Sequence, residues 1–223
     1  MDKGKSKNKK YFLLLLPLVL ILTTALVFYF SSNFFGSNLS YIIGFSFYYV
    51  FWCYGATLAL MGRKGFVSLF KEVNPLFSKK NWYLIIIFFM LVLGTVLMYL
   101  IPSINEATLN LILLAVPIAL VHGVGEEALW RGLYIRTYPK NIILGVIYPS
   151  VAFALWHLSP QMVFPAENLI AFVGSTLFLG VSYAIIAYKT GSIKWVAFLH
   201  VLGSLLALGQ PITTSILSLL GLQ

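Results

Sequence analysis

Charged residues are scarce in this chain of 223 residues, making up 9% of it against about 25% in a soluble domain. Only 6 residues are acidic and 15 are basic, whereas 60% are hydrophobic. So few charges cannot keep a protein of this size in water. The composition therefore excludes a soluble globular enzyme, a nucleic-acid-binding domain and a disordered tail, and it is typical of a protein that lies in a membrane.

Cysteine is nearly absent as well. The single cysteine, Cys53, lies within an apolar run, which excludes an internal disulfide framework and a zinc site built on cysteines. The net charge of +9 arises mainly from ten basic residues within 1–10 and 63–80, both next to long apolar runs. That placement is typical of the basic cytoplasmic loops of a membrane protein and requires no nucleic acid as a partner.

Long apolar runs are abundant, and a membrane-spanning helix needs about 20 mostly apolar residues. The predicted spans cover residues 11–30, 40–61, 82–101, 109–135, 141–159, 168–188 and 192–209, and a shorter apolar stretch covers 212–222. Basic and non-basic loops alternate between them, which predicts a cytoplasmic N-terminus. We therefore expect an all-α, polytopic transmembrane helix bundle of seven or eight spans.

Ionisable residues inside the predicted spans are the main functional signal, because each is costly at membrane depth. Glu126 and Glu127 are adjacent, so their side chains point about 100° apart on a helix. Arg131 lies four residues after Glu127 and on the same face, which makes these two a natural structural ion pair. Glu126 is then left to face the bundle interior as a candidate general base.

All three histidines of the chain also lie in predicted spans. His157 and His200 come from other helices than Glu126, and with it they could hold a water molecule or a metal ion. His122 stacks one turn before Glu126, but it fits a hydrogen-bonded packing role better than the other two. A proton or ion pathway would use the same residue types, so these residues alone leave both an enzyme and a transporter open.

Three spaced motifs are more specific. They are EExxxR at 126–131, FxxxH from Phe153 to His157, and HxxxS from His200 to Ser204. In this order, on separate predicted helices, they resemble the CAAX-protease and bacteriocin-processing (CPBP, or Abi) family of intramembrane proteases, which includes the type II CAAX prenyl endopeptidases. The matched stretch covers roughly residues 115–209. Together with the charges and the apolar runs, it leads us to divide the chain into a basic cytoplasmic N-terminus at 1–10, a three-span region without motifs at 11–101, and a CPBP-like catalytic membrane region at 102–223.

The resemblance implies an intramembrane endopeptidase that uses a glutamate-activated water molecule. By motif position, Glu126 and His157 would activate the water, His200 and Ser204 would stabilise the oxyanion, and Glu127, Arg131 and Phe153 would support the site. The family usually has Asn where this chain has Ser204, whose hydroxyl is a shorter and less fixed donor. Loss of one oxyanion donor can lower the rate by about 10²–10³-fold.

The expected partners are a peptide or lipidated protein tail and the membrane lipids, with no nucleic acid. The resemblance favours a mechanism without a cofactor, and the alternative is a zinc ion held by Glu126, His157 and His200. The small size suits a bacterial or archaeal cell-membrane protein that processes bacteriocins or signalling peptides or confers self-immunity. The competing hypotheses are a non-catalytic scaffold or immunity protein of the same fold, favoured by Ser204, and a small proton-coupled transporter.

Depth along the helices is the strictest test of a shared site. At about 1.5 Å per residue, Glu126 and His200 lie about 15 Å and 13 Å from their cytoplasmic turns, whereas His157 lies about 25 Å from its own. A kink at Pro149, or a recessed turn, would be needed to bring His157 level with the others.

Overall fold

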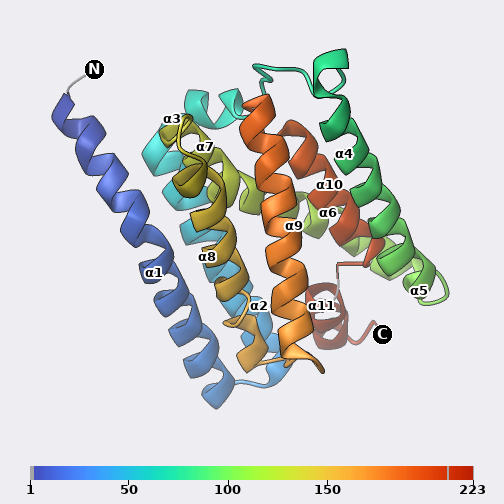
Figure 1. The fold of residues 1–223 in the computed structure, drawn as a ribbon. Coiled ribbons are helices and arrows are strands. Elements are labelled where there is room, and N and C mark those ends of the chain that lie inside the picture. Colours follow the sequence, from blue (N-terminus) through green and yellow to red (C-terminus); the bar gives the residue numbers. More distant parts are fainter. Residues whose placement is uncertain (1–2, 210, 223) are drawn as a thin grey trace.

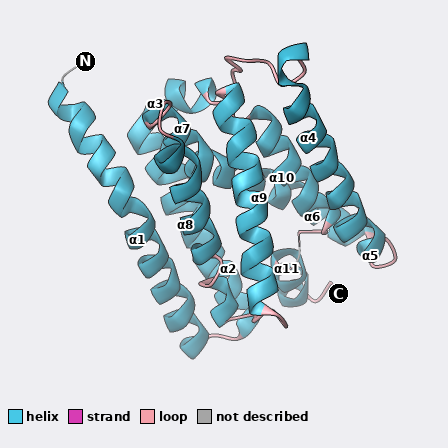
Figure 2. Cartoon of the chain, viewed as in Figure 1, coloured by secondary structure: helices cyan, strands magenta, loops and turns pink. Residues whose placement is uncertain are grey.

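The computed structural model describes residues 3–209 and 211–222, and within these ranges every regular element is a helix (Figures 1 and 2). The predicted all-α membrane bundle is therefore confirmed. Part of the predicted basic segment 1–10 lies outside the description, namely residues 1–2 and the side chains of residues 3–9.

Consecutive elements join into long apolar helices that alternate in direction across the bundle (Figure 1). The elements are α1 (Lys3–Phe34), α2 (Ser37–Phe47), η1 (Tyr48–Ala56), α3 (Thr57–Ser68), η2 (Lys79–Asn81), α4 (Trp82–Thr95), η3 (Val96–Leu100), α5 (Ile101–Ser103), α6 (Leu109–Glu127), η4 (Ala128–Gly132), α7 (Leu133–Thr137), η5 (Ile143–Ile147), α8 (Tyr148–Trp156), η6 (Pro160–Met162), α9 (Leu169–Thr190), α10 (Lys194–Leu206) and α11 (Ile212–Leu220). The elements η1, η3, η4 and η5 are π-helical.

Six helices in the described ranges are long and apolar enough to cross a membrane. They are Lys10–Phe34, Ser37–Ser68, Lys79–Ser103, Leu109–Thr137, Ile143–Met162 and Leu169–Thr190. Each coincides with one of the first six predicted spans. The seventh predicted span forms α10, whose 13 residues extend about 20 Å, short of the hydrocarbon thickness of about 30 Å. The short eighth stretch forms the 9-residue α11.

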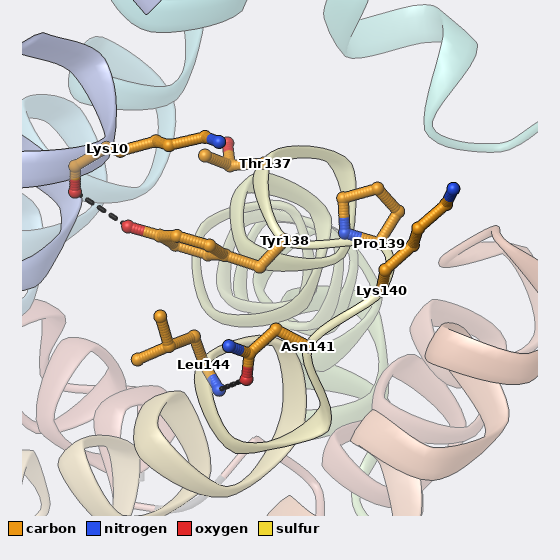
Figure 3. Close-up of a pocket in the computed structure, with 7 residues that line it drawn as sticks. All are labelled: Lys10, Thr137, Tyr138, Pro139, Lys140, Asn141 and Leu144. Atoms are coloured by element: carbon orange, nitrogen blue, oxygen red, sulfur yellow. Dashed lines mark hydrogen bonds between the residues drawn. The ribbon is translucent and has the colours of Figure 1, made fainter. Parts of the chain in front are cut away.

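The basic segments gather at one end of the bundle. The Tyr138 hydroxyl donates to the carbonyl oxygen of Lys10 at 2.7 Å, beside a shallow hollow that Lys140 also lines (Figure 3). At the same end, the Lys194 ammonium lies 3.5 Å from the Glu72 carboxylate, which ties the loop after α3 to the start of α10. This grouping agrees with the predicted alternation of loops, while the cytoplasmic location of this end stays a prediction.

An aromatic core fixes η1, η4 and α8 against one another. The rings of Tyr48 and Trp156 stack with centroids 3.8 Å apart, and Trp130 donates its indole N–H to the Tyr48 hydroxyl at 2.7 Å. All three side chains are fully buried. Large buried aromatic rings contribute strongly to packing and allow little sliding, so they hold the helix with the EExxxR motif in a defined position beside α8.

Candidate active site

Glycine brings the two helices of the site close together. Gly123 on α6 lies against α10, where an added Cβ would stand 2.6 Å from the backbone nitrogen of Val201. No side chain fits at that separation, so only glycine permits this approach. Gly123, three residues before Glu126, therefore sets the distance at which His122 and Glu126 meet His200, the residue before Val201.

The expected contact between Glu127 and Arg131 is present. The Arg131 guanidinium donates to Glu127 Oε1 at 2.9 Å, and both side chains are buried. Arg131 also donates to the Gly180 carbonyl of α9 at 3.4 Å, and its guanidinium carbon lies 4.4 Å from the ring centroid of Phe153. Arg131 thus ties α6 and η4 to α8 and α9, and Phe153 covers it with an aromatic face.

His200 is oriented by the same carboxylate. Its Nδ1 lies 2.7 Å from Glu127 Oε1, and since a carboxylate paired with Arg131 can only accept, Nδ1 carries the proton. The other nitrogen, Nε2, lies 3.0 Å from Nε2 of His122 and 3.6 Å from Glu126 Oε2. The hydrogen bond to Glu127 therefore turns Nε2 of His200 toward Glu126.

Glu126 is fully buried, with its Oε2 3.7 Å from His122 Nε2. Neither of its carboxylate oxygens makes a hydrogen bond to any described residue. A buried polar group without a partner costs free energy, so one left in this state at a candidate site is a strong sign that a ligand or water belongs there. The histidine rings beside it are partly exposed, 22% for His122 and 16% for His200.

His157 ends α8 and presents one nitrogen as an acceptor. Its Nδ1 donates to the Phe153 carbonyl at 2.8 Å, and because a carbonyl can only accept, the neutral ring has an unprotonated Nε2. The ring packs against Phe153 and against Phe172 of α9, with centroid separations of 4.4 Å and 5.8 Å. These contacts fix the orientation of the His157 ring.

A cavity of about 640 Å³ is lined by several of the predicted site residues, while the buried Glu126 is not among the residues of its wall. His157, His200 and Ser204 all line it, and most of its other lining residues are apolar or aromatic. The predicted difference in depth therefore does not keep His157 from sharing a cavity with His200 and Ser204. The Phe153 ring lies near both histidines, with its centroid 4.4 Å from that of His157 and 6.4 Å from that of His200.

Two residues at the site go beyond the sequence-based assignment. The sequence favours a packing role for His122, whereas in the structure this residue lines the cavity and contacts both His200 and Glu126. The second residue is Tyr49, whose hydroxyl lies 2.6 Å from Nδ1 of His122. The four-residue spacing between His122 and Glu126 is the sequence signal that points to His122. Nothing marks Tyr49, which belongs to the three-span region without motifs.

The structure also bears on which residues could hold a metal ion. Among the described residues, His122, Glu126 and His200 each offer a ligand atom, all within 4.8 Å of one another. This set contains His122 where the sequence predicted His157. The hollow in Figure 3 lies elsewhere, between Lys10 and the turn at 137–141, and belongs to the basic end of the bundle.

Comparison with known proteins returned no significant match among curated proteins. No solved structure matches either. One family model matches, described as type II CAAX prenyl endopeptidase Rce1-like, over residues 108–206. This stretch contains all three motifs, from Glu126 to Ser204, and excludes the first three spans. Residues 108–206 thus match the Rce1-like family of CAAX prenyl endopeptidases, and the resemblance predicted from the motifs is confirmed.

Proposed function

We propose that this protein is an intramembrane endopeptidase in which Glu126 activates a water molecule. The single observation that carries this proposal is the fully buried Glu126 carboxylate, without a hydrogen-bonding partner among the described residues and beside a histidine-lined cavity. An unpaired carboxylate suits a general base that must bind the hydrogen of a water molecule. The match to the Rce1-like family supports proteolysis as the reaction.

In the proposed reaction, the water oxygen attacks the carbonyl carbon of the scissile peptide bond. Glu126 takes one proton from that water, while Nε2 of His157 accepts a hydrogen bond from it and fixes its orientation. The carbon–nitrogen bond of the tetrahedral intermediate then breaks, and the proton held by Glu126 passes to the departing amine. The products are a carboxylic acid and an amine, and the enzyme returns to its starting state.

The oxyanion of the intermediate would face His200 and Ser204, which line the cavity together. When both of its nitrogens carry a proton, His200 donates through Nδ1 to Glu127 and through Nε2 to the oxyanion. Ser204, four residues later on α10, supplies a second donor from its hydroxyl. Fixed donors aimed at developing negative charge are among the largest contributions to enzymatic rate.

The cavity indicates the class of substrate. Most of its wall is apolar or aromatic, with Met90, Met98 and Phe178 among the lining side chains. An apolar cavity of about 640 Å³ within a membrane bundle favours an extended peptide with an apolar or lipid-bearing tail. We propose that such tails are the substrates, among them bacteriocin precursors and signalling peptides, processed in a cell membrane of bacterial or archaeal type.

The test is cleavage in liposomes of fluorescent peptides with and without a lipid tail. Glu126→Gln removes the base and should lower kcat/KM by about 10²–10⁴-fold. Glu167→Gln, the same chemical change in the exposed loop before α9, is the matched control and should cleave normally. Chelator is present throughout, so that metal ions play no part. Cleavage by Glu126→Gln at the wild-type rate would refute the mechanism.

A non-catalytic immunity protein of the same fold is the second candidate, favoured by Ser204 in the position where the family usually has Asn. For that function the Glu126→Gln protein should retain the full cellular phenotype, such as protection against a bacteriocin. Loss of both cleavage and phenotype in the same variant would exclude this alternative.

A further inference from the structure

We propose that His122, Glu126 and His200 form a binding site for a divalent transition-metal ion of the Zn²⁺ type, and that loading this site withdraws Glu126 from catalysis. The existence of the site follows from the geometry of these three residues. Its effect on cleavage rests in addition on the proposed role of Glu126 as a general base.

The distances between the three ligand atoms suit a metal ion. They are 3.0 Å between the two Nε2 atoms, 3.7 Å from His122 Nε2 to Glu126 Oε2, and 3.6 Å from His200 Nε2 to the same oxygen. Tetrahedral zinc with bonds of about 2.0–2.1 Å places neighbouring ligand atoms about 3.3 Å apart. The three observed distances lie within about 0.4 Å of this value, so small side-chain rotations would place the three atoms at bonding distance from one ion.

Both imidazole rings are held by partners outside the triangle. Nδ1 of His122 lies 2.6 Å from the Tyr49 hydroxyl, and Nδ1 of His200 lies 2.7 Å from Glu127 Oε1. Each histidine therefore engages one nitrogen with a neighbour and directs the other toward Glu126. Metal-binding histidines are usually oriented in this way by a carboxylate or another oxygen on the second ring nitrogen.

Glu126 supplies the independent observation that a ligand belongs here. Its carboxylate is fully buried, and neither oxygen has a hydrogen-bonding partner within the described part of the chain. The nearby cation, Arg131, is engaged by Glu127 at 2.9 Å. A buried negative charge is costly unless it is paired or coordinates a metal, and a divalent ion at the triangle would meet that need.

The site would keep an open coordination position. Both histidine rings line the cavity, so the fourth side of a tetrahedral ion would face the space where substrate binds. Glu126 Oε2 would be occupied by the metal bond and could no longer take a proton from water. Metal loading and hydrolysis by the glutamate mechanism would therefore exclude each other.

Binding is measured on the purified full chain in detergent micelles, with an affinity tag that contains no histidine. The chain itself has 3 histidines and 1 cysteine, so competing ligands are few. Co²⁺ is titrated and followed by its visible absorption, and Zn²⁺ is then used to displace it. We expect one ion per chain with an intense tetrahedral spectrum. His122→Asn removes a ligand and should weaken binding by at least about 100-fold, beyond the effect of an outer-shell change.

Two further variants separate ligands from neighbours. Tyr49→Phe keeps the ring but loses the hydroxyl against His122, and should weaken binding by about 10–100-fold. His157→Asn changes a histidine of the same cavity that lies outside the triangle, and should bind Co²⁺ like the wild type. Zn²⁺ added to the wild type should then suppress peptide cleavage, and a chelator should restore it.

The outcomes are distinct. Absence of a specific Co²⁺ spectrum in the wild type, or equal weakening by His157→Asn and His122→Asn, would overturn the site. Binding with the expected ligand dependence but faster cleavage on adding Zn²⁺ would overturn the mutual exclusion and make the metal catalytic. Failure of the proposed function shows separately, as Glu126-independent cleavage in the presence of chelator.

Discussion

Replacing Arg131 by methionine should destabilise the protein strongly. The side chains of Arg131 and Glu127 are 1% and 0% exposed. The substitution therefore leaves the buried Glu127 carboxylate without its ion-pair partner, and His200 remains as its hydrogen-bond donor. Losing one partner of a buried ion pair costs about 3–5 kcal/mol. Loss of the guanidinium over the Phe153 ring adds about 0.5–1 kcal/mol. We expect a total of about 3.5–6 kcal/mol.

The assay is a double-mutant cycle on unfolding in mixed micelles with increasing fractions of denaturing detergent. Glu127→Gln removes the charge that Arg131 balances while keeping an oxygen that accepts from His200. The double variant, Glu127→Gln with Arg131→Met, should therefore be more stable than Arg131→Met alone. The coupling energy should be about 2–3 kcal/mol, within the range for residues in one buried network.

Two results would refute this reasoning. A cost below about 1 kcal/mol for Arg131→Met would place the pair with surface ion pairs and show that water reaches it. A double variant whose cost equals the sum of the single costs would show that the two residues act independently. Either would remove the structural basis for how His200 is held.

Gly123→Ala should lower the free energy of unfolding by about 1–3 kcal/mol, because the added methyl group meets the α10 backbone. Gly94→Ala, where the added methyl group meets no other atom, should raise it by about 0.5–1 kcal/mol, and thermal unfolding measures both changes. Ser204→Ala should lower kcat by about 10²–10³-fold while Ser204→Asn stays active, and an unaffected Ser204→Ala would remove the hydroxyl from the oxyanion role. Tyr48→Phe leaves the buried Trp130 N–H without its acceptor and should cost about 1–3 kcal/mol; an unchanged unfolding midpoint would contradict the contact.

The bundle and much of the site follow from local sequence patterns. Apolar runs near 20 residues predict six of the long helices, because the length of a spanning helix is set by the bilayer. The contact between Glu127 and Arg131 follows from four-residue spacing on one helix. The helices and this contact depend only on residues close together in the sequence, so both could be predicted without knowing the tertiary structure.

Contacts between distant segments could not be predicted in this way. Tyr49 meets His122 across 73 positions of sequence, and no motif links the two. The shortness of α10 is also hidden, because its apolar run looks like that of a spanning helix until the helix is seen to end at Leu206. The grouping of His122 with His200 needed the packing of α6 on α10, which Gly123 permits.

The burial of Glu126 has a chemical consequence for selectivity. Its carboxylate is fully buried beside two imidazole rings that are only 22% and 16% exposed, so bulky reagents reach it poorly. A bulky carboxyl-modifying reagent such as a carbodiimide would label the exposed Glu167 well before Glu126. The same burial disfavours direct attack of the Glu126 carboxylate on the substrate, which would form an anhydride, and favours water as the attacking species.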